Sequence, residues 1–291
     1  MERIVATNTE RVTVKKTWKL YLGGAFVRSE SGRYLTTDDG EHYCHASRKD
    51  VRDAVSAALK AQPGWAARTA YNRGQILYRL AEVLETRRCE LLASLTRGGA
   101  QSAAAEREVD AAIDRVVGYA GWADKLAAVL STSNPVAGPH FGFTVVEPTT
   151  IVGVVAPLRP ALLGLVGCIC PIIVSGNAVV VAPSDEDPRT AVTLAEALAT
   201  CDLPGGVVNL LTGESQATGS VLAKHQGVRA LDLWNLPDDG ARELELSAAD
   251  NVKRVSRRSL TEEQWYDDQT LSPGWISRFV EHKAIWHPVG V

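Results

Sequence analysis

The residues that could take part in chemistry lie just after two short apolar segments. Ala156-Pro157-Leu158-Arg159 follows the β-branched run from Ile151 to Ala156, and Ala182-Pro183-Ser184-Asp185 follows the run from Ala178 to Ala182. Between these runs, residues 161–174 are apolar almost throughout, which predicts a buried helix. Strand, helix and strand in this order form a βαβ unit, and open parallel sheets bind ligands beyond the carboxyl ends of their strands. The pattern therefore predicts that any nucleotide site lies at these two segments.

Side chains of other reactive types are scattered along the chain. No P-loop, G-x-G-x-x-G or G-x-S-x-G motif is present. Cys168 and Cys170 form a C-x-C pair, but no further cluster of metal-binding spacing accompanies them. The five cysteines are an odd number without a disulfide framework, so we expect reduced thiols. The six histidines, which we expect to be solvated or hydrogen-bonded, are His42, His45, His140, His225, His282 and His287. We predict no metal site and no catalytic residue.

The composition is that of an ordinary soluble globular protein. The chain has 291 residues, of which 45% are hydrophobic and 22% charged, and its formal net charge is −3. This charge gives no reason to expect nucleic-acid or membrane partners. The first sixteen residues lack the apolar core of a signal peptide, and the apolar run at 161–174 is too short to span a bilayer. We therefore expect a cytoplasmic protein.

Several further elements can be read from periodicity and turn residues. Residues 18–35 predict two short strands, and a capping box at Ser47 and Asp50 starts a helix that we expect to end at Pro63-Gly64-Trp65. One amphipathic helix is expected from Arg73 to Leu95, and another over residues 102–130. The elements expected after these are a loop at 131–139, a strand at 141–147, a helix that follows the Asp187-Pro188 cap and ends near Cys201, and strands at 206–211 and 228–233.

The order of these elements and several of their motifs resemble the NAD(P)-dependent aldehyde dehydrogenases. That family has a strand, I-x-P-W-N-F-P, a buried helix, A-x-G-N and V-x-K-P-A-E in succession, as residues 151–187 do in outline. Residues 203–213, LPGGVVNLLTG, nearly reproduce the family's L-P-x-G-V-V-N-x-x-x-G, and residues 247–255 resemble A-A-x-N-L-K-R-V. The resemblance covers residues 18–255 and returns at 277–290. It implies an aldehyde-dehydrogenase-type Rossmann-like parallel α/β sheet with helices on both faces.

The departures from the family pattern fall on its functional positions. Arg159 or a neighbour stands where the family has its catalytic Asn, and Ala182 replaces the cofactor-binding Lys. Asp185 replaces the family Glu. The phosphate-binding F-T-G-S-x-x-x-G is replaced by LWNLPDDG, in which only Gly240 survives. Two aspartates, at 238 and 239, stand where a helix N-terminus would receive phosphate, and their charge would repel it.

The family's catalytic domain has no room in this sequence. The base Glu of the family falls at about Arg258, and only 23 residues separate Val255 from Phe279. A domain needs on the order of 100 residues or more. The family's nucleophilic Cys lies in that domain, and this chain has no Cys after Cys201. The resemblance therefore implies a truncated member without its catalytic machinery, similar to the cysteine-less second half of tandem aldehyde dehydrogenases.

We predict four parts of the chain. Residues 1–17 form an N-terminal arm, and 18–255 a nucleotide-binding-type α/β domain with an oligomerisation strand near 140–148. Residues 256–276 are a linker that replaces the catalytic domain, and 277–291 hold a second oligomerisation strand. In the family, such strands form a small sheet that joins subunits. The resemblance places a vestigial NAD or NADP site at Pro157, Ser184, Asp185, Gly213 and Gly240.

Three functions remain open at this point. The first is a non-catalytic subunit that assembles with itself or with a full-length aldehyde dehydrogenase, because the residues for catalysis are lost while both subunit-joining segments remain. The second is a free-standing NAD(P)-binding or sensing module. The third is an active oxidoreductase with relocated chemistry.

Overall fold

The centre of the molecule is a seven-stranded sheet in the order β12-β11-β8-β9-β10-β2-β3. The computed structural model describes Val12 and residues 14–290, so most of the predicted arm at 1–17 lies outside the described residues. From β12 to β10 the strands run parallel, and β2 and β3 continue the sheet in antiparallel pairing. The strands are β2 Leu20–Leu22, β3 Ala25–Val27, β8 Ile151–Val155, β9 Ala178–Ala182, β10 Val208–Leu210, β11 Ala230–Trp234 and β12 Arg254–Arg258. The predicted parallel α/β sheet is confirmed.

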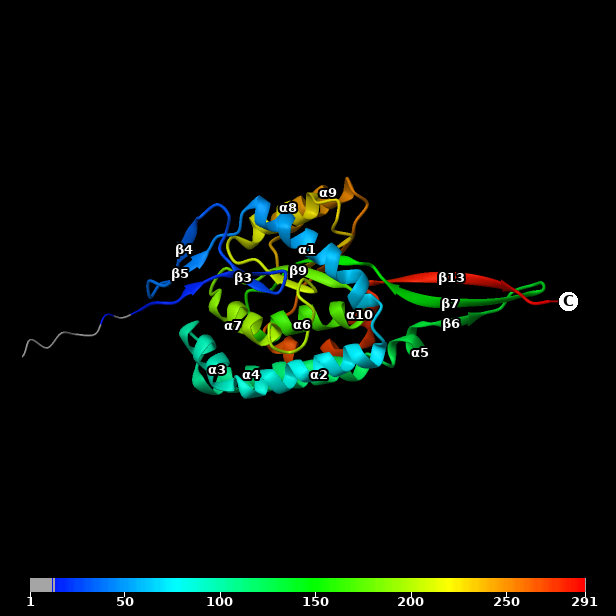
Figure 1. Ribbon diagram of the computed structural model, residues 1–291, viewed down its shortest axis with the longest axis horizontal. Helices are drawn as coiled ribbons and strands as arrows, with labels where there is room; N and C mark the ends of the chain where they lie inside the picture. The colour runs from blue at the N-terminus through cyan, green and yellow to red at the C-terminus, as the bar shows by residue number, and fades with distance from the viewer. Residues whose placement is uncertain (1–11, 13, 291) are drawn as a thin grey trace, which may run out of the picture.

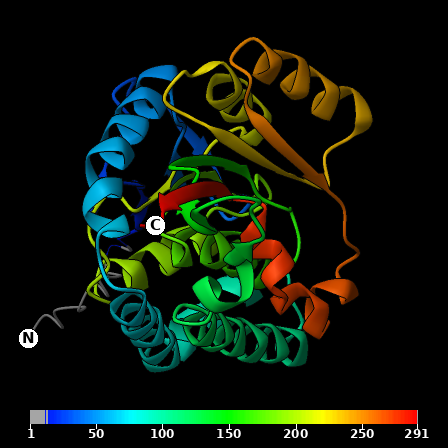
Figure 2. The ribbon, with the colours of Figure 1, turned by 90° about the vertical axis from the view of Figure 1, so that its right-hand side faces the viewer.

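Helices cover both faces of this sheet (Figure 1). One layer contains α1 Arg48–Ala66, α8 Ser215–Lys224 and α9 Asp238–Ala249. The other layer contains α2 Ala70–Thr86, α3 Arg88–Arg97, α4 Ser102–Trp122, α6 Ala161–Val174 and α7 Arg189–Leu198. Each layer packs its own apolar core against the sheet. The end-on view in Figure 2 shows the sheet enclosed between the two layers.

The βαβ unit at the centre follows directly from its sequence. All residues of β8 and β9 are buried, as expected for strands covered on both faces. Helix α6 is buried along nearly its whole length. Gly176 ends the turn after α6 with a φ of +96°, a conformation that a side chain would strain.

Helix boundaries are where the structure departs most from the sequence-based expectations. The helix expected at 73–95 is two helices, α2 and α3, which meet at Arg87. The apolar stripe continues across this junction, with Leu84 and Leu91 both fully buried, so periodicity could not reveal it. Helix α1 runs past Pro63 to Ala66, because Trp65 is buried and donates from Nε1 to the carbonyl of Ile173 at 2.8 Å.

Smaller differences concern short elements. The helix expected at 102–130 is α4 followed by α5 Leu126–Leu130, and the loop at 131–139 contains β6 Thr132–Asn134. Near the N-terminus, β1 Thr17–Trp18, β4 Tyr34–Thr36 and β5 His42–Cys44 form a separate small sheet. The predicted helix after Asp187 is α7, which ends at Leu198 rather than at Cys201.

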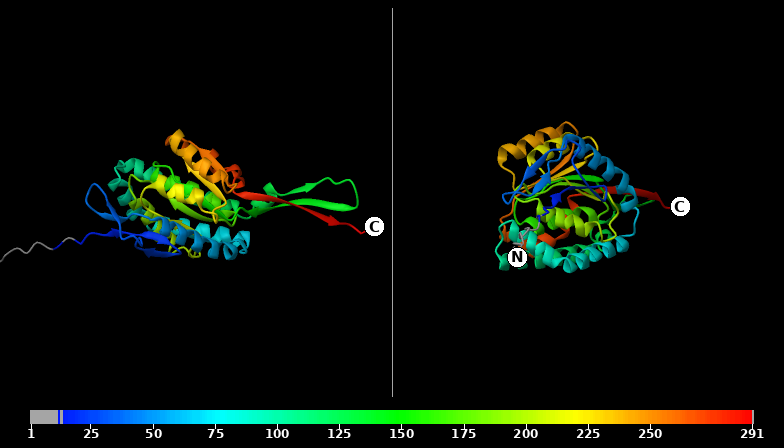
Figure 3. Two further views of the ribbon diagram at one scale, coloured as in Figure 1. Left: turned by 90° about the horizontal axis from the view of Figure 1, so that it is seen from above. Right: turned by 60° about the vertical axis from the view of Figure 1, so that its left-hand side comes forward.

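A third sheet projects from the body as an arm, which we call the flap (Figures 1 and 3). It consists of β13 Val280–Pro288, β7 His140–Pro148 and β6, in that order. Strands β7 and β13 pair antiparallel along their whole length, from Val280 opposite Pro148 to Pro288 opposite His140. The two strands predicted near 140–148 and 277–291 therefore exist and pair with each other, while Val291 lies outside the described residues.

The base of the flap is fixed to the central sheet. Asn177, fully buried between α6 and β9, accepts from the Thr150 backbone N–H at 2.7 Å and donates to the Phe279 carbonyl at 2.7 Å. Arg254 on β12 donates to the Val280 carbonyl at 3.0 Å and pairs with Glu281 at 2.9 Å. These contacts hold the flap to β8, β9 and β12, so the arm is an extension of the domain.

The segment predicted to be a polar linker, residues 256–276, is folded. It contains the end of β12, two 3₁₀ turns at Glu263–Tyr266 and Asp268–Leu271, and most of α10 Pro273–Ser277. Three side chains one helical turn apart on α4 donate to its backbone. Arg115 reaches the carbonyl of Trp265 at 2.9 Å, Tyr119 that of Thr270 at 2.7 Å, and Trp122 that of Leu271 at 2.9 Å. Figure 2 shows this orange-red segment beside the second helical layer.

Aromatic side chains of this segment complete the core at the end of β11. Trp265 and Trp275 pack on Trp234 of β11, with ring centroids 4.6 and 5.1 Å from it. Arg258 lies over the Trp234 ring at 3.9 Å and pairs with the fully buried Asp232 at 2.6 Å. Burial raises the pKa of the Asp232 carboxyl, and Arg258 opposes this shift.

Among the described residues, every helix is too short or too polar to serve as a membrane span.

Candidate functional site

The carboxyl edge of the five parallel strands is where the sequence places a ligand site. Helices α6, α7, α8 and α9 follow β8, β9, β10 and β11, so all four begin at this edge. A free helix N-terminus offers unpaired N–H groups and a positive dipole end, which together attract phosphate. The question for each of these helices is therefore which group occupies its first turn.

The N-terminus of α6 is occupied by a buried carboxylate from α4. Glu108, only 6% exposed, accepts from the backbone N–H of Leu162 at 2.6 Å and of Leu163 at 3.1 Å. Burial raises the pKa of the Glu108 carboxyl, and the two backbone donors act against this shift. The predicted site residues did not include Glu108. The signal that would have found it is an acidic residue within the otherwise apolar buried face of α4, between Ala105 and Val109.

The N-terminus of α8 is occupied in the same way by one of the predicted residues. Asp185 accepts from the backbone N–H of Ser215 at 2.8 Å and from its hydroxyl at 3.0 Å. Burial raises the pKa of Asp185, and the bonds from Ser215 oppose this shift. Ser184, also predicted, accepts from the Glu186 backbone N–H at 3.2 Å, so its hydroxyl stabilises the turn after β9.

Helix α7 also begins with an aspartate. Asp187 accepts from the Arg189 backbone N–H at 2.8 Å and forms an ion pair with the guanidinium of Arg189 at 2.6 Å. Arg189 is buried and also pairs with Asp39 of the loop between β4 and β5 at 2.5 Å. This arrangement fixes the small N-terminal sheet to α7.

At α9 the two aspartates lie where the sequence predicts them, in the first turn. Asp239 accepts from the Gly240 backbone N–H at 2.9 Å, and Asp238 pairs with Arg257 of β12. The carbonyl of Gly240 accepts from Nε2 of Gln216 on α8 at 3.2 Å. Gly240 therefore lies in a contact between two helices.

The other two predicted residues have packing roles. The ring of Pro157 lies so close to Gly164 of α6 that a Cβ on this glycine would come within 2.6 Å of Pro157 Cγ. Gly213 has a φ of +134°, and a Cβ on this glycine would come within 2.8 Å of His45 Cδ2. The structure thus brings the five predicted residues to the same edge of the sheet, and each of them contacts other parts of the chain.

A cavity of about 240 Å³ remains at this edge, beside the first turn of α6. Its walls include four carboxyl groups, those of Glu108, Glu186, Asp187 and Glu262. Arg159 is the single cationic side chain among its lining residues, and it pairs with Glu186 at 2.8 Å. The residues present do not fit a dinucleotide, because carboxylates hold the helix N-termini and line the cavity where its phosphates would lie.

No reactive thiol lies at this edge within the described residues. Cys168 and Cys170 face the core, and burial raises the pKa of Cys170 to about 12. Cys201 is also buried, and its pKa is raised to about 11. A nucleophilic cysteine needs its thiolate form, which these environments disfavour.

The described residues also contain no group of three or more Cys, His, Asp or Glu that could hold a metal ion.

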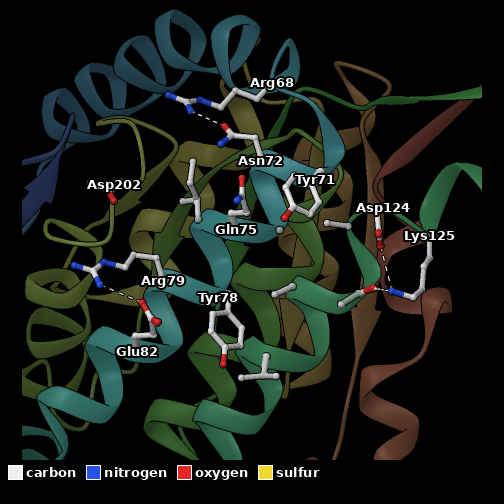
Figure 4. Close-up of a pocket in the computed structure, with 16 residues that line it drawn as sticks. Arg68, Tyr71, Asn72, Gln75, Tyr78, Arg79, Glu82, Asp124, Lys125 and Asp202 are labelled. Carbon is white, nitrogen blue, oxygen red and sulfur yellow. Dashed lines mark hydrogen bonds and ion pairs between the residues drawn. The ribbon is translucent and has the colours of Figure 1, made fainter.

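A separate hollow of about 820 Å³ lies between α2 and α4, remote from the carboxyl edge (Figure 4). Except for Asp202, its charged side chains pair with neighbours in the same hollow. Arg68 donates to Asn72 at 2.7 Å, and Arg79 and Lys125 pair with Glu82 and Asp124 at 3.1 Å each. Among the described residues, this leaves Asp202 as the one charged lining residue without such a partner, and we assign no site to the hollow.

Replacement of Glu108 by glutamine should change how stability depends on pH. Glutamine keeps an oxygen acceptor for Leu162 and Leu163 but has no charge to bury. Because the folded-state pKa of Glu108 is raised, the stability that its proton confers is present below the unfolded pKa and is lost as pH rises through the folded pKa. Chemical unfolding from acidic to neutral pH should therefore show E108Q gaining stability over the wild type as pH rises. A difference that stays constant would contradict this.

Comparison with known proteins agrees with this fold. The sequence profile of the aldehyde dehydrogenase family matches residues 35–257. Cytosolic 10-formyltetrahydrofolate dehydrogenase of Mus musculus is 31% identical over 259 residues, which are 85% of this chain and 29% of that protein. Mitochondrial benzaldehyde dehydrogenase of Antirrhinum majus is 31% identical over 248 residues, 82% of this chain and 46% of that protein.

Solved structures show the same relation. The NAD-dependent aldehyde dehydrogenase from Sinorhizobium meliloti superposes with a TM-score of 0.77 at 26% identity, over 84% of this chain and 50% of that one. The chain thus spans half or less of the length of these relatives. The profile match, the sequence identity and the superposed structure lead to one conclusion: the chain belongs to the aldehyde dehydrogenase family.

Proposed function

We propose that this chain is a non-catalytic subunit that assembles with a full-length aldehyde dehydrogenase or with a second copy of itself. The observation that carries the proposal is the flap. It extends from the body (Figures 1 and 3). It carries an exposed aromatic side chain on each face, Phe141 on one and Trp286 on the other, and exposed apolar surfaces can mark an interaction site. The carboxyl edge supports the non-catalytic part, because its residues neither fit a dinucleotide nor supply a nucleophile.

The strand register shows how the apolar side chains are arranged on the flap. On one face, Phe141 and Phe143 stack at 5.5 Å, and Ile285 lies opposite Phe143. On the other face, Trp286 packs beside His140 at 6.0 Å. Phe141 is 52% exposed and Trp286 64%. A covering partner would remove these apolar side chains from water and so stabilise the complex.

The outer strand adds a second means of association. β13 is an edge of the flap sheet, because it pairs with β7 on one side only. A free edge presents unpaired backbone groups that can template pairing with another chain. The partner would therefore contact both the edge and the aromatic faces.

The native mass of the protein, purified gently from its own cells, tests the proposal. We expect a complex that contains an aldehyde dehydrogenase or a homo-oligomer of this chain. The purified chain should also shift the mass of such an enzyme, its rate, or both, when the two are mixed. A monomer that leaves the enzyme's mass and rate unchanged would refute the proposal. We place this assembly in the cytoplasm, by analogy with the mouse relative that is named cytosolic.

The alternative function is a free-standing NAD(P)-binding or sensing module. This alternative is favoured by the Sinorhizobium relative, which is named as an NAD-dependent enzyme. We expect calorimetric titration with NAD⁺, NADH and NADP⁺, with excess pyrophosphate present to occupy any phosphate site elsewhere on the chain, to show no binding at millimolar cofactor, since carboxylates occupy the edge. Measurable affinity without turnover would favour this module over our proposal. Formation of NADH or NADPH with a panel of aldehydes would show instead that the chain is an active oxidoreductase.

A further inference from the structure

A basic groove lies between the N-terminus of α1 and the C-terminal half of α8. Its volume is about 860 Å³, and the loop that precedes β4 forms its third wall. Five cationic side chains line it, against one carboxylate, that of Glu30. The cations are Arg33, Arg48, Lys49, Arg52 and Lys224. They come from three separate elements, although the chain as a whole carries a net charge of −3.

Part of this charge is neutralised by neighbouring groups. Glu30 accepts from the Ser47 hydroxyl at 3.2 Å and pairs with Lys49 at 3.2 Å. Arg52 pairs with Asp53 at 2.7 Å. Within the part of the chain that the structure describes, the side chains of Arg33, Arg48 and Lys224 have no ion-pair partner. Three unpaired cations therefore border one groove, with one from the loop, one from α1 and one from α8.

The N-terminus of α1 does not account for this site, because it is already capped. Ser47 accepts from the Asp50 backbone N–H at 3.2 Å, and Asp50 accepts from the Ser47 backbone N–H at 2.8 Å. Asp50 is buried and also accepts from the Ser29 hydroxyl at 2.7 Å. The attraction for anions thus depends on the side chains, and the Ser220 hydroxyl in the groove can add a hydrogen bond.

We propose that this groove binds a multiply charged phosphate anion, either pyrophosphate or the phosphates of a nucleotide. Arginine binds phosphate through its planar fork of donors, and lysine binds it as a point charge. Three cations on separate elements match an anion that carries charge on more than one phosphate. The cavity at the carboxyl edge of the sheet is lined mainly by carboxylates, which would repel the same ligand. The groove and the carboxyl edge therefore carry charge of opposite sign. The groove lies at the N-terminal end of α1. The flap base lies at the C-terminal end of α1, where Gly176 is close to both Ala66 and Pro148. The groove is therefore separate from the flap, and binding there requires no partner.

Calorimetric titration of the full chain with inorganic pyrophosphate in physiological salt tests this. We expect saturable binding in the wild type, and a double variant, Arg33→Gln with Lys224→Gln, should bind at least about tenfold more weakly. The matched control is Lys60→Gln, which removes an exposed cation of α1 that does not line the groove and should leave affinity unchanged. Thermal melts should show all variants folded, because the three side chains are exposed.

A parallel titration with ADP distinguishes the two sources of phosphate. Tighter binding of ADP than of pyrophosphate would identify a nucleotide as the ligand, and equal binding would identify the phosphates alone. Absence of saturable binding of both probes would overturn the proposal. It would also be overturned if Lys60→Gln weakened binding as much as the groove variant, since the attraction would then be non-specific. Neither result bears on assembly through the flap, which the native mass decides.

Discussion

Replacement of Trp265 by alanine is expected to lower the free energy of unfolding by about 3–5 kcal/mol, the usual cost of truncating a buried tryptophan. Trp265 is fully buried, contacts Trp234 and Trp275, and packs on Gly167 of α6. Denaturant unfolding followed by circular dichroism measures the loss.

A tryptophan from the flap provides the matched control. Trp286 is 64% exposed, so its replacement by alanine should change the unfolding free energy of the isolated chain by no more than about 0.5 kcal/mol. If both variants lost equally little stability, residues 256–276 would be the loosely attached linker that their polar composition suggests. A large loss with Trp265 alone would show that this segment is part of the domain.

This contrast explains why the segment after β12 could not be predicted from sequence. Its fold depends on backbone carbonyls, which accept from Arg115, Tyr119 and Trp122 of α4. Every residue has a backbone carbonyl, so the sequence does not show which carbonyls accept these hydrogen bonds. The donor side chains also lie about 150 residues earlier in the chain. Strands β8 and β9 could be predicted because burial on both faces requires an unbroken apolar run. The hydrophobic pattern of the sequence therefore identifies the central strands of the sheet. The packing of the segment after β12 depends instead on hydrogen bonds between residues far apart in the sequence.

The candidate site shows the same division. The carboxyl edge could be located from strand order alone, and the aspartates of α9 were visible in the sequence. Glu108 was missed because its role depends on the approach of α4 to the first turn of α6, which no local motif encodes. The predicted residues Ser184 and Asp185 lie at this edge, but each is bonded to the chain's own backbone. Position in the fold was thus predictable, whereas the bonding partner of each group was not.

The contacts of the tail complete the apolar core at the end of β11. The chain covers about half of the Sinorhizobium enzyme, yet its core at the end of β11 is closed by Trp265, Trp275 and the Asp232–Arg258 pair. A buried charge pair is costly unless it is well bonded, and here the carboxylate also accepts from the Trp234 indole N–H at 2.7 Å. Among the described residues, the Phe and Trp side chains that are more than half exposed are Phe141 and Trp286, and both lie on the flap. This directs the functional question to assembly.

A double variant of the flap, Phe141→Ser with Trp286→Ser, should abolish assembly while the chain itself stays folded. Aromatic side chains at the centre of an interface often contribute about 2–4 kcal/mol each, so loss of both should weaken association by at least a hundredfold. Native mass spectrometry at fixed concentration should show the complex replaced by the free chain. The unfolding free energy of the isolated chain should hardly change, because both side chains are more than half exposed.

A control variant at another exposed aromatic residue distinguishes specific docking through the flap from non-specific hydrophobic association. Tyr78 of α2 is 53% exposed and lies in the hollow between α2 and α4, away from the flap. Tyr78→Ser removes a comparable surface ring and should leave the complex intact. Loss of the complex with Tyr78→Ser, or its survival in the flap variant, would show that association uses another surface. Because β13 and β7 pair along nine residues, the flap can lose both rings and keep its backbone hydrogen bonds, so a lost complex would report on the aromatic faces themselves.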